Sequence, residues 1–300
     1  MVATPPGRLF VERYGVVESI QGVMRYVAFL RNESNLGTAP PIDLGKIYRR
    51  FDLPEPELGP LDQQALLLDP EAGLILLKED DPRVRQRFSE AHELIEMLIS
   101  ALPTGQGWKA RQHGIFKPKA KEDICNAAAA ELLMPRNAFM PLLHHAGASF
   151  ETARQLARKF WVSTTASLKR VAELANGCHA VVLWQIANKP SEIKHRVPAS
   201  QASFLDVPAN DLPPKQLRVG WAFKRPLEPI IPTHKSVPED SAIYRAWQGV
   251  TFTSGTDRLD LGPIRGIIRS ENYAFAVPED TLVLSLLHLP GDSGCGRGQS

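Results

Sequence analysis

The 300-residue sequence has little of several features that mark specialised classes of protein. It contains only three cysteines, Cys125, Cys178 and Cys295, and this odd, widely spaced set predicts neither a disulfide framework nor a zinc site built on thiolates. No apolar run reaches the roughly 18 residues of a membrane-spanning helix, and the N-terminus lacks the apolar stretch of a signal peptide. We therefore expect a protein of the reducing cytoplasm that does not enter a membrane.

An excess of charge of one sign is also missing. Lys and Arg number 35 against 33 Asp and Glu, which leaves a net charge of +2. This balance argues against a polybasic coat for nucleic acid, although a local basic patch remains possible. Hydrophobic residues make up 43% of the chain and charged residues 23%, values typical of a globular protein with a real core.

The pattern of apolar residues predicts an α+β fold, mainly helical at first and β-rich later. The first helix is expected over 16–33, and a short second helix is expected after a cap at Asp43. A third helix is expected to begin at Pro82 and to include the segment 87–102, and a fourth to run from about Glu122 to Leu133. The segments QQALLLD and GLILLKED, separated by the turn PEAG, predict two short strands. Beyond Gly177, four segments are typical of strands: HAVVLWQI, LRVGWAF, YAFAV and TLVLSLLHL.

The predicted helix over 87–102 carries a His-Glu-x-x-Glu pattern, one residue away from the His-Glu-x-x-His signature of zinc peptidases. Residues i and i+4 share a helix face, about 5–6 Å apart at Cβ, so His92 and Glu96 can bind one metal ion. Glu93 lies roughly 100° further round the helix, where it can reach a water on the ion and act as general base. The alternative is an amphipathic helix with a solvated acidic face.

A catalytic zinc site needs a third protein ligand, and Glu122 is the best candidate. It opens the predicted helix EDICNAAAAELLMP, whose small residues suit close packing against another helix. Asn126, four residues later on the same face, is suited to support a ligand by a hydrogen bond. His113 in the preceding loop is the competing ligand. Glu122 is also compatible with a helix N-terminal acid, and Cys125 with a small buried filler.

Taken together, these segments resemble the ImmA/IrrE family of metallo-endopeptidases. RQRFSEAHELIE followed by EDICNAAAAELLMP is similar to the family patterns R-x-R-F-x-x-A-H-E-x-x-H and E-x-x-A-N-x-F-A-A-x-L-L-M-P. PPIDLGKIYRRFDL upstream and LARKFWVSTTASLKRVAEL downstream extend the likeness to about half of the chain. The resemblance implies a zincin-like fold in which His92 and Glu122 bind the metal and Glu93 is the base.

The chain departs from the family pattern at the second helix ligand, where Glu96 stands in place of the usual His. Smaller departures are Cys125 where Ala is common and Ala128 where Phe is common. A His-Glu-Glu set can still bind zinc, but two carboxylates cancel the charge of a divalent ion and polarise its water less. Oxygen ligands also favour harder ions, so we expect Zn²⁺ with Mn²⁺ as the alternative, and we discount full peptidase activity.

A helix-turn-helix-like segment is predicted over 148–177, with Ser149 as N-cap and Gly177 as the stop. Its basic residues outweigh its two acids: Arg154, Arg158, Lys159, Lys169 and Arg170. Against a DNA-reading role, Trp161 occupies the turn position where Gly is usual, and Ser167 stands where an apolar residue normally packs. We therefore favour a structural bridge or protein-docking element over DNA binding.

The predicted organisation has four parts. A zincin-like metallopeptidase domain spans 1–147, the helix-turn-helix-like segment 148–177, a β-rich domain 178–290 and a disordered tail 291–300. The β-rich part resembles the extension of longer family members, some of which carry a GAF-like sensor fold. Its core is expected to contain Trp184, Trp221 and Trp247.

Two functions follow as hypotheses. The resemblance implies a cytoplasmic metallo-endopeptidase that cuts a protein, in particular a helix-turn-helix transcriptional repressor, in response to stress or mobile-element induction. The alternative is a non-catalytic regulator of the same fold that binds a repressor or DNA, with a weak or structural metal site.

Overall fold

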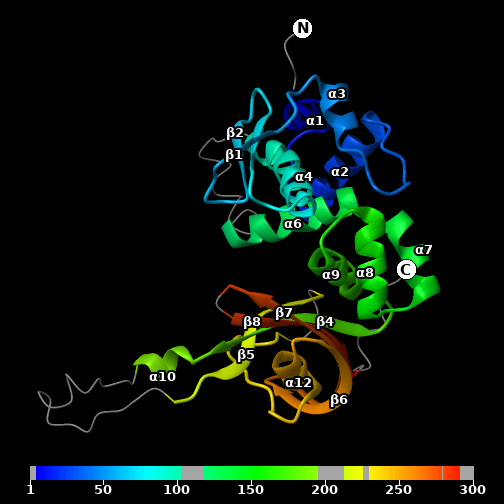
Figure 1. Cartoon of the computed structure of the whole chain (residues 1–300). Coiled ribbons are helices and arrows are strands. Elements are labelled where there is room, and N and C mark those ends of the chain that lie inside the picture. Colours follow the sequence, from blue (N-terminus) through cyan, green and yellow to red (C-terminus); the bar gives the residue numbers. More distant parts are fainter. Residues whose placement is uncertain (1–4, 103–117, 195–212, 226–229, 279, 291–300) are drawn as a thin grey trace, which may run out of the picture. The chain divides into compact units, whose positions relative to one another are not determined.

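A computed structural model describes residues 5–102, 118–194, 213–225, 230–278 and 280–290 of the chain. Helices and two separate sheets alternate along it, which confirms the predicted α+β class (Figure 1). His113 and the expected tail 291–300 lie outside the described residues. No helix within the described ranges has both the length and the apolar character needed to cross a membrane.

The chain forms two compact units. The first comprises Met1–His145 with Gln155–Ser167, and the second Ala146–Arg154 with Leu168–Ser300. Helices α8 (Phe150–Phe160) and α9 (Thr164–Leu174) therefore contribute residues to both units.

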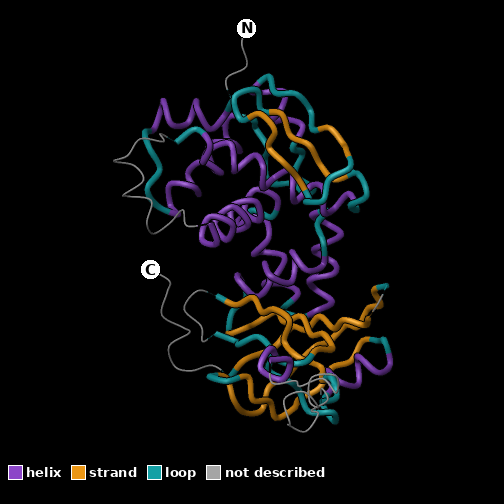
Figure 2. Tube along the Cα trace, turned by 90° about the vertical axis from the view of Figure 1, so that its left-hand side faces the viewer, coloured by secondary structure: helices purple, strands orange, loops and turns teal. Residues whose placement is uncertain are grey.

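The first unit contains a bundle of helices and a small sheet, as the sequence predicts. Its elements are α1 (Pro6–Tyr14), α2 (Ile20–Glu33), α3 (Gly45–Phe51), β1 (Glu57–Gly59), β2 (Ala65–Asp69), β3 (Leu74–Lys78), α4 (Arg83–Ser100), α6 (Pro118–Leu133) and α7 (Arg136–Ala146). The two predicted strands pair as an antiparallel hairpin, β2 with β3, and the unpredicted β1 adds to β3 in parallel. Figure 2 shows these short strands beside the helices.

Side chains accept hydrogen bonds from amides at the start of α2 and α3, and α2 begins at Ile20, four residues later than the sequence predicts. Ser19 accepts a hydrogen bond from the Gly22 amide at 3.2 Å, and Asp43 accepts one from the Gly45 amide at 3.0 Å. Such caps satisfy amides that have no partner inside the helix.

Helix α6 begins earlier than predicted, and this changes the setting of Glu122. The helix starts at Pro118, so Glu122 lies one turn inside it and does not open it. The expectation that Glu122 is an N-terminal acid is therefore wrong. Proline suits the first turn of a helix, and the Lys-Ala-Lys sequence that follows favours helix, which is the physical reason for the longer α6.

The packing of α2, α4 and α6 forms the core that positions the candidate site. Leu94 and Ile95 of α4 are fully buried, and so are Ala128 and Ala129 of α6. The Tyr26 hydroxyl on α2 donates a hydrogen bond to the Leu94 carbonyl at 3.0 Å. Small side chains such as these alanines let two helices approach closely. With Leu94 and Ile95 buried in the core, the neighbouring face of α4 is turned toward α6.

Arg87 fixes the first half of α4 to two other segments of the same unit. Its Nη2 donates to the Ile42 carbonyl at 2.8 Å and its Nε to the Trp161 carbonyl at 3.3 Å. The guanidinium also lies 4.9 Å from the centroid of the Trp161 ring. Trp161 has a φ of +54°, the left-handed conformation that glycine usually adopts in this turn. The contacts with Arg87 help to hold this unusual conformation.

The second unit is β-rich, as predicted. It contains β4 (Cys178–Ala187), α10 (Pro190–Lys194), β5 (Gln216–Lys224), α12 (Ala242–Gly249), β6 (Phe252–Leu261), β7 (Ile264–Val277) and β8 (Asp280–Leu289). The antiparallel sheet has the order β5-β4-β8-β7-β6 and curls around α12 (Figure 1).

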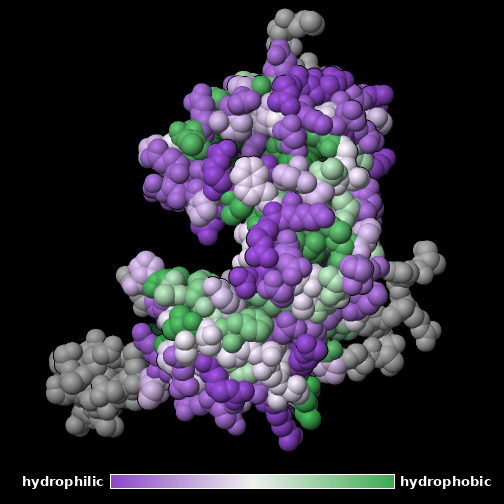
Figure 3. All heavy atoms as spheres, turned by 45° about the vertical axis from the view of Figure 1, so that its right-hand side comes forward, coloured by the Kyte–Doolittle hydropathy of each residue, from purple (hydrophilic) through white to green (hydrophobic). Residues whose placement is uncertain are grey.

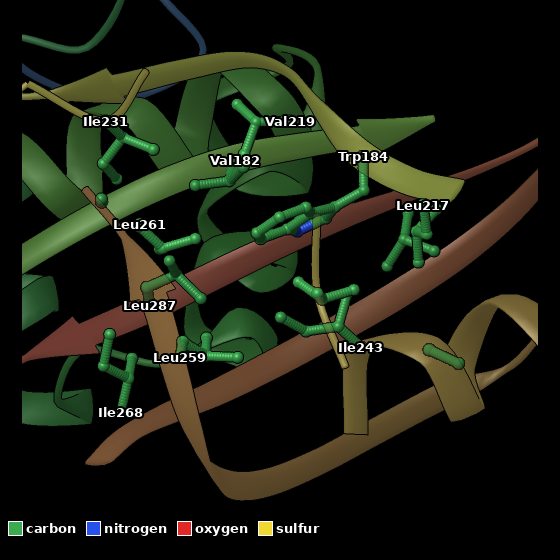
Figure 4. Close-up of a cluster of buried hydrophobic side chains, with 14 of the residues drawn as sticks. Val182, Trp184, Leu217, Val219, Ile231, Ile243, Leu259, Leu261, Ile268 and Leu287 are labelled. Carbon is green, nitrogen blue, oxygen red and sulfur yellow. The ribbon is translucent and has the colours of Figure 1, made fainter. Parts of the chain in front are cut away.

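The core of this unit lies between the sheet and α12, as Figure 4 shows. Trp184 is fully buried in it, and Trp247 packs against it. The Trp184 indole donates to Ser285 at 2.9 Å, and Ser285 donates to Asn272 at 2.6 Å. Trp221 is partly buried, with the Lys169 ammonium 4.7 Å from its ring centroid.

Polar side chains cover most of the face of the molecule seen in Figure 3, with apolar groups scattered among them. The exposed apolar side chains include Ile267, Leu58 and Leu68, with exposed fractions of 72%, 52% and 49%. Single apolar residues of this kind are normal on protein surfaces.

A buried acid ties the beginning of α8 to the sheet of the second unit. Glu271 accepts hydrogen bonds from the Phe150 amide at 2.7 Å and from His288 at 3.0 Å, and Arg269 lies 3.3 Å away. Burial raises the pKa of Glu271, but these hydrogen bonds and charges outweigh it and leave the pKa below its ordinary value. Folding therefore favours the ionised form of this carboxyl.

We predict that Glu271→Gln lowers the free energy of unfolding by about 2 kcal/mol at pH 7, the cost of charged hydrogen bonds to a buried group. A depressed folded-state pKa gives stability that is complete above the unfolded value and is lost as the pH falls. The difference between parent and variant should therefore shrink below about pH 4. Urea unfolding followed by tryptophan fluorescence measures it. The exposed Glu239→Gln is the control, and an equal difference at pH 7 and pH 3.5 would contradict this account.

Candidate metal centre

The candidate site lies where α4 packs against α6. His92 and Glu96 are four residues apart on α4 and share one face. Helix α6 presents two neighbouring rows at the same spacing, Lys121 with Cys125 and Glu122 with Asn126. The two α4 side chains each contact a different row.

His92 contacts the row of Glu122 and Asn126. Its Nδ1 lies 3.3 Å from Asn126 Oδ1, and its Nε2 lies 3.6 Å from Glu122 Oε2. If Asn126 accepts the Nδ1 proton, the lone pair of Nε2 is directed toward Glu122. Ligand histidines are commonly oriented by such a hydrogen bond from the other ring nitrogen.

Glu96 contacts the row of Lys121 and Cys125. The Lys121 ammonium forms an ion pair with Glu96 Oε1, and the Cys125 thiol donates to Glu96 Oε2 at 3.8 Å. Cys125 is fully buried, and burial, followed by the charge of Glu96, raises the pKa of its thiol. Neither Lys121 nor Cys125 is among the site residues that the sequence predicts. Their spacing of four residues, one position before Glu122 and Asn126, was the signal that could have found them.

Three possible ligand atoms come together at this point. One each from His92, Glu96 and Cys125 lie within 4.8 Å of one another, a group that does not include the more exposed Glu122. An imidazole, a carboxylate and a thiol are all ligands of zinc. The ammonium of Lys121 lies against Glu96 and would compete with a metal ion for this carboxylate. The donor set therefore fits a divalent metal ion.

Glu93 occupies a different environment from Glu96, although the two acids lie less than one turn apart. Its exposed fraction is only 9%, and its carboxylate accepts a hydrogen bond from the backbone of Leu67 in β2. Burial, and then the charge of Glu96, raise the pKa of Glu93 to about 7. A carboxyl with such a pKa is suited to accept a proton near neutral pH.

The other histidines named by the sequence do not extend the site. His113 lies outside the described residues, so its part as a competing ligand stays a prediction. His144 and His145 are exposed at the end of α7.

The clustered donors form a possible metal site, and comparison with known proteins indicates a metallopeptidase type of domain. Residues 55–172 match the Peptidase_M78 family, described as the IrrE N-terminal-like domain. This match agrees with the resemblance of the motifs to the ImmA/IrrE family of metallopeptidases.

One relative is the radiation response metalloprotease IrrE of Deinococcus deserti. It is 32% identical over 115 residues, which are 38% of this chain and 41% of the relative's length. The similarity thus spans less than half of either protein. A solved structure, a Mycobacterium tuberculosis transcriptional regulator, matches with a TM-score of 0.55 and 12% identity over 94% of this chain and 79% of that one. At this identity the likeness shows a shared fold alone.

We predict that Lys121→Met makes the protein bind zinc about tenfold more tightly, because the Lys121 ammonium competes directly with the ion for Glu96. A tenfold change in affinity corresponds to about 1.4 kcal/mol of binding free energy. Isothermal titration of metal-free protein measures the affinity. Lys119→Met is the matched control, since Lys119 is an exposed lysine on the same helix. Unchanged or weaker zinc binding by Lys121→Met would show that Glu96 does not bind the ion.

Proposed function

We propose that the protein is a metal-dependent endopeptidase whose ligands are His92, Glu96 and Glu122 and whose base is Glu93. The observation that carries the proposal is the meeting of His92 and Glu96 with α6 beside the buried, weakly acidic Glu93. A bound divalent ion would supply Lewis-acid polarisation of the scissile carbonyl and of the attacking water. We propose Zn²⁺, with Mn²⁺ as the alternative for a set rich in carboxylates.

The protein's own residues divide the remaining work. Glu93 takes a proton from the attacking water and gives it to the departing amine, roles for which a pKa of about 7 is suited. Asn126 orients the imidazole of His92 through Nδ1. The backbone contact with Leu67 holds the carboxylate of Glu93 in place between its two proton transfers.

The proposed substrate is a helix-turn-helix transcriptional repressor, cut in response to stress or induction of a mobile element. Two names support this choice: the relative is a radiation response metalloprotease, and the protein with the shared fold is a transcriptional regulator. The first name refers to a stress response and a protease, and the second to the control of transcription. The proposed site of action is the cytoplasm, where such a repressor would be met.

Direct binding of DNA by α8 and α9 is less well supported. Arg170, one of the basic residues of this segment, is buried and paired with Glu173 at 2.8 Å. Lys169 lies against Trp221, and the turn residue Trp161 is held by Arg87. These contacts support a structural role for the segment.

A second candidate function is a regulator without peptidase activity that binds the same repressor. The ion pair between Lys121 and Glu96 favours it, because the chain's own cation already satisfies a proposed ligand. In that case the metal would be bound weakly or would only stabilise the fold. The variants below distinguish the two functions.

We predict that Glu93→Gln abolishes cleavage of a repressor encoded by a neighbouring gene and leaves the metal content nearly unchanged, because the base is not a ligand. Cleavage is followed by electrophoresis and metal content by elemental analysis. Glu90→Gln is the control, since Glu90 is another largely buried acid of α4 with a pKa raised to about 7, chiefly by burial. Cleavage at the parent rate by Glu93→Gln would remove Glu93 from the mechanism.

We further predict that Glu96→Ala loses the metal, while Glu96→His keeps zinc and cleaves faster at neutral pH. The neutral imidazole leaves more positive charge on the ion than a carboxylate does, so polarisation is stronger. Zinc titration and cleavage rates of both variants test this. If Glu96→Ala binds zinc as tightly as the parent, Glu96 is an ordinary surface acid.

A further inference from the structure

Two residues that depart from the family pattern, Glu96 and Cys125, are in contact with each other. Glu96 stands in place of a His on α4 and Cys125 in place of an Ala on α6, and the Cys125 sulfur lies 3.8 Å from Glu96 Oε2. We propose that Cys125 is itself a ligand of the metal ion, so that its thiolate supplies the soft donor that the change from His to Glu removes. This inference rests on the proposed metal site and deepens it.

The distances are those expected of two ligands of one ion. Zinc bonds of about 2.3 Å to sulfur and about 2.0 Å to oxygen, at a tetrahedral angle, place the two donor atoms about 3.5 Å apart. The observed separation of 3.8 Å between Cys125 Sγ and Glu96 Oε2 differs little from this value. With His92, the three donors fit within 4.8 Å of one another, so small side-chain rotations suffice to bring them around one ion.

Burial and charge agree with an internal ligand. Cys125 is fully buried and its sulfur is directed at a proposed ligand, unlike a thiol that reacts with external molecules. When the ion binds, a metal–sulfur bond forms, the S–H bond breaks and the proton goes to solvent, with no change of oxidation state. The thiolate and the carboxylate of Glu96 would then match the two positive charges of the ion, and the proposed ligand Glu122 would add a third negative charge.

A thiolate changes which metal the site prefers. Sulfur ligands select zinc, whereas a set of one imidazole and two carboxylates tolerates manganese. The protein should therefore bind Zn²⁺ far more tightly than Mn²⁺. Removing the sulfur should cost much more zinc affinity than manganese affinity.

The test is a titration of the metal-free, full-length protein with Co²⁺, Zn²⁺ and Mn²⁺ under reducing conditions. We expect the parent to show the near-ultraviolet charge-transfer absorption of a cobalt–thiolate bond. Cys125→Ala should lack this absorption, and its affinity for zinc should be at least tenfold lower than that of the parent. Lys119→Met, which changes an exposed residue of the same helix and keeps the sulfur, should retain both.

The outcomes separate this inference from the proposed function. If the parent binds one equivalent of cobalt without thiolate absorption, or if Cys125→Ala keeps its zinc affinity, Cys125 is not a ligand and the peptidase proposal still stands. If the parent binds none of the three metals, the metal site fails and this inference fails with it. Cys125→Ser, closer in size to the parent, is measured beside Cys125→Ala, and circular dichroism shows that both are folded.

Discussion

The close packing of α4 against α6 is the contact on which the candidate site depends. Buried Leu94 and Ile95 fix one face of α4, and buried Ala128 and Ala129 let α6 approach. Only this approach brings side chains from two helices to distances of 3 to 4 Å, as between His92 and Asn126 or Cys125 and Glu96. A larger side chain at the alanines would separate the helices and disperse the donors.

Environment gives the neighbouring acids of α4 different properties. Glu96 faces α6, where Lys121 and Cys125 supply donors to its carboxylate. Glu93 is directed elsewhere and is more buried, so its charged form is disfavoured, although its carboxylate accepts a hydrogen bond from the backbone of Leu67. One helix can therefore present the proposed ligand Glu96 and the proposed base Glu93 from the same short motif, because the two side chains face different surroundings.

Support for α4 comes from outside the site. Arg87 binds the carbonyls of Ile42 and Trp161 and lies against the Trp161 ring, so the turn between α8 and α9 is tied to the helix that carries the motif. This contact gives a physical reason for a tryptophan where a DNA-reading turn usually has glycine. The hydrogen bond between Arg87 and Trp161 joins residues that are 74 positions apart in the sequence.

The sequence by itself determined the parts of the protein that follow local periodicity. The spacing of His92 and Glu96 places both on one face, and the strand pair and the change to β-rich structure after Gly177 are visible in its apolar pattern. Its motifs also carry the resemblance to a metallopeptidase family. Tertiary structure alone decided what faces Glu96. The early start of α6 at Pro118 and the register between the two helices, neither of which a local pattern specifies, bring Lys121 and Cys125 to that carboxylate.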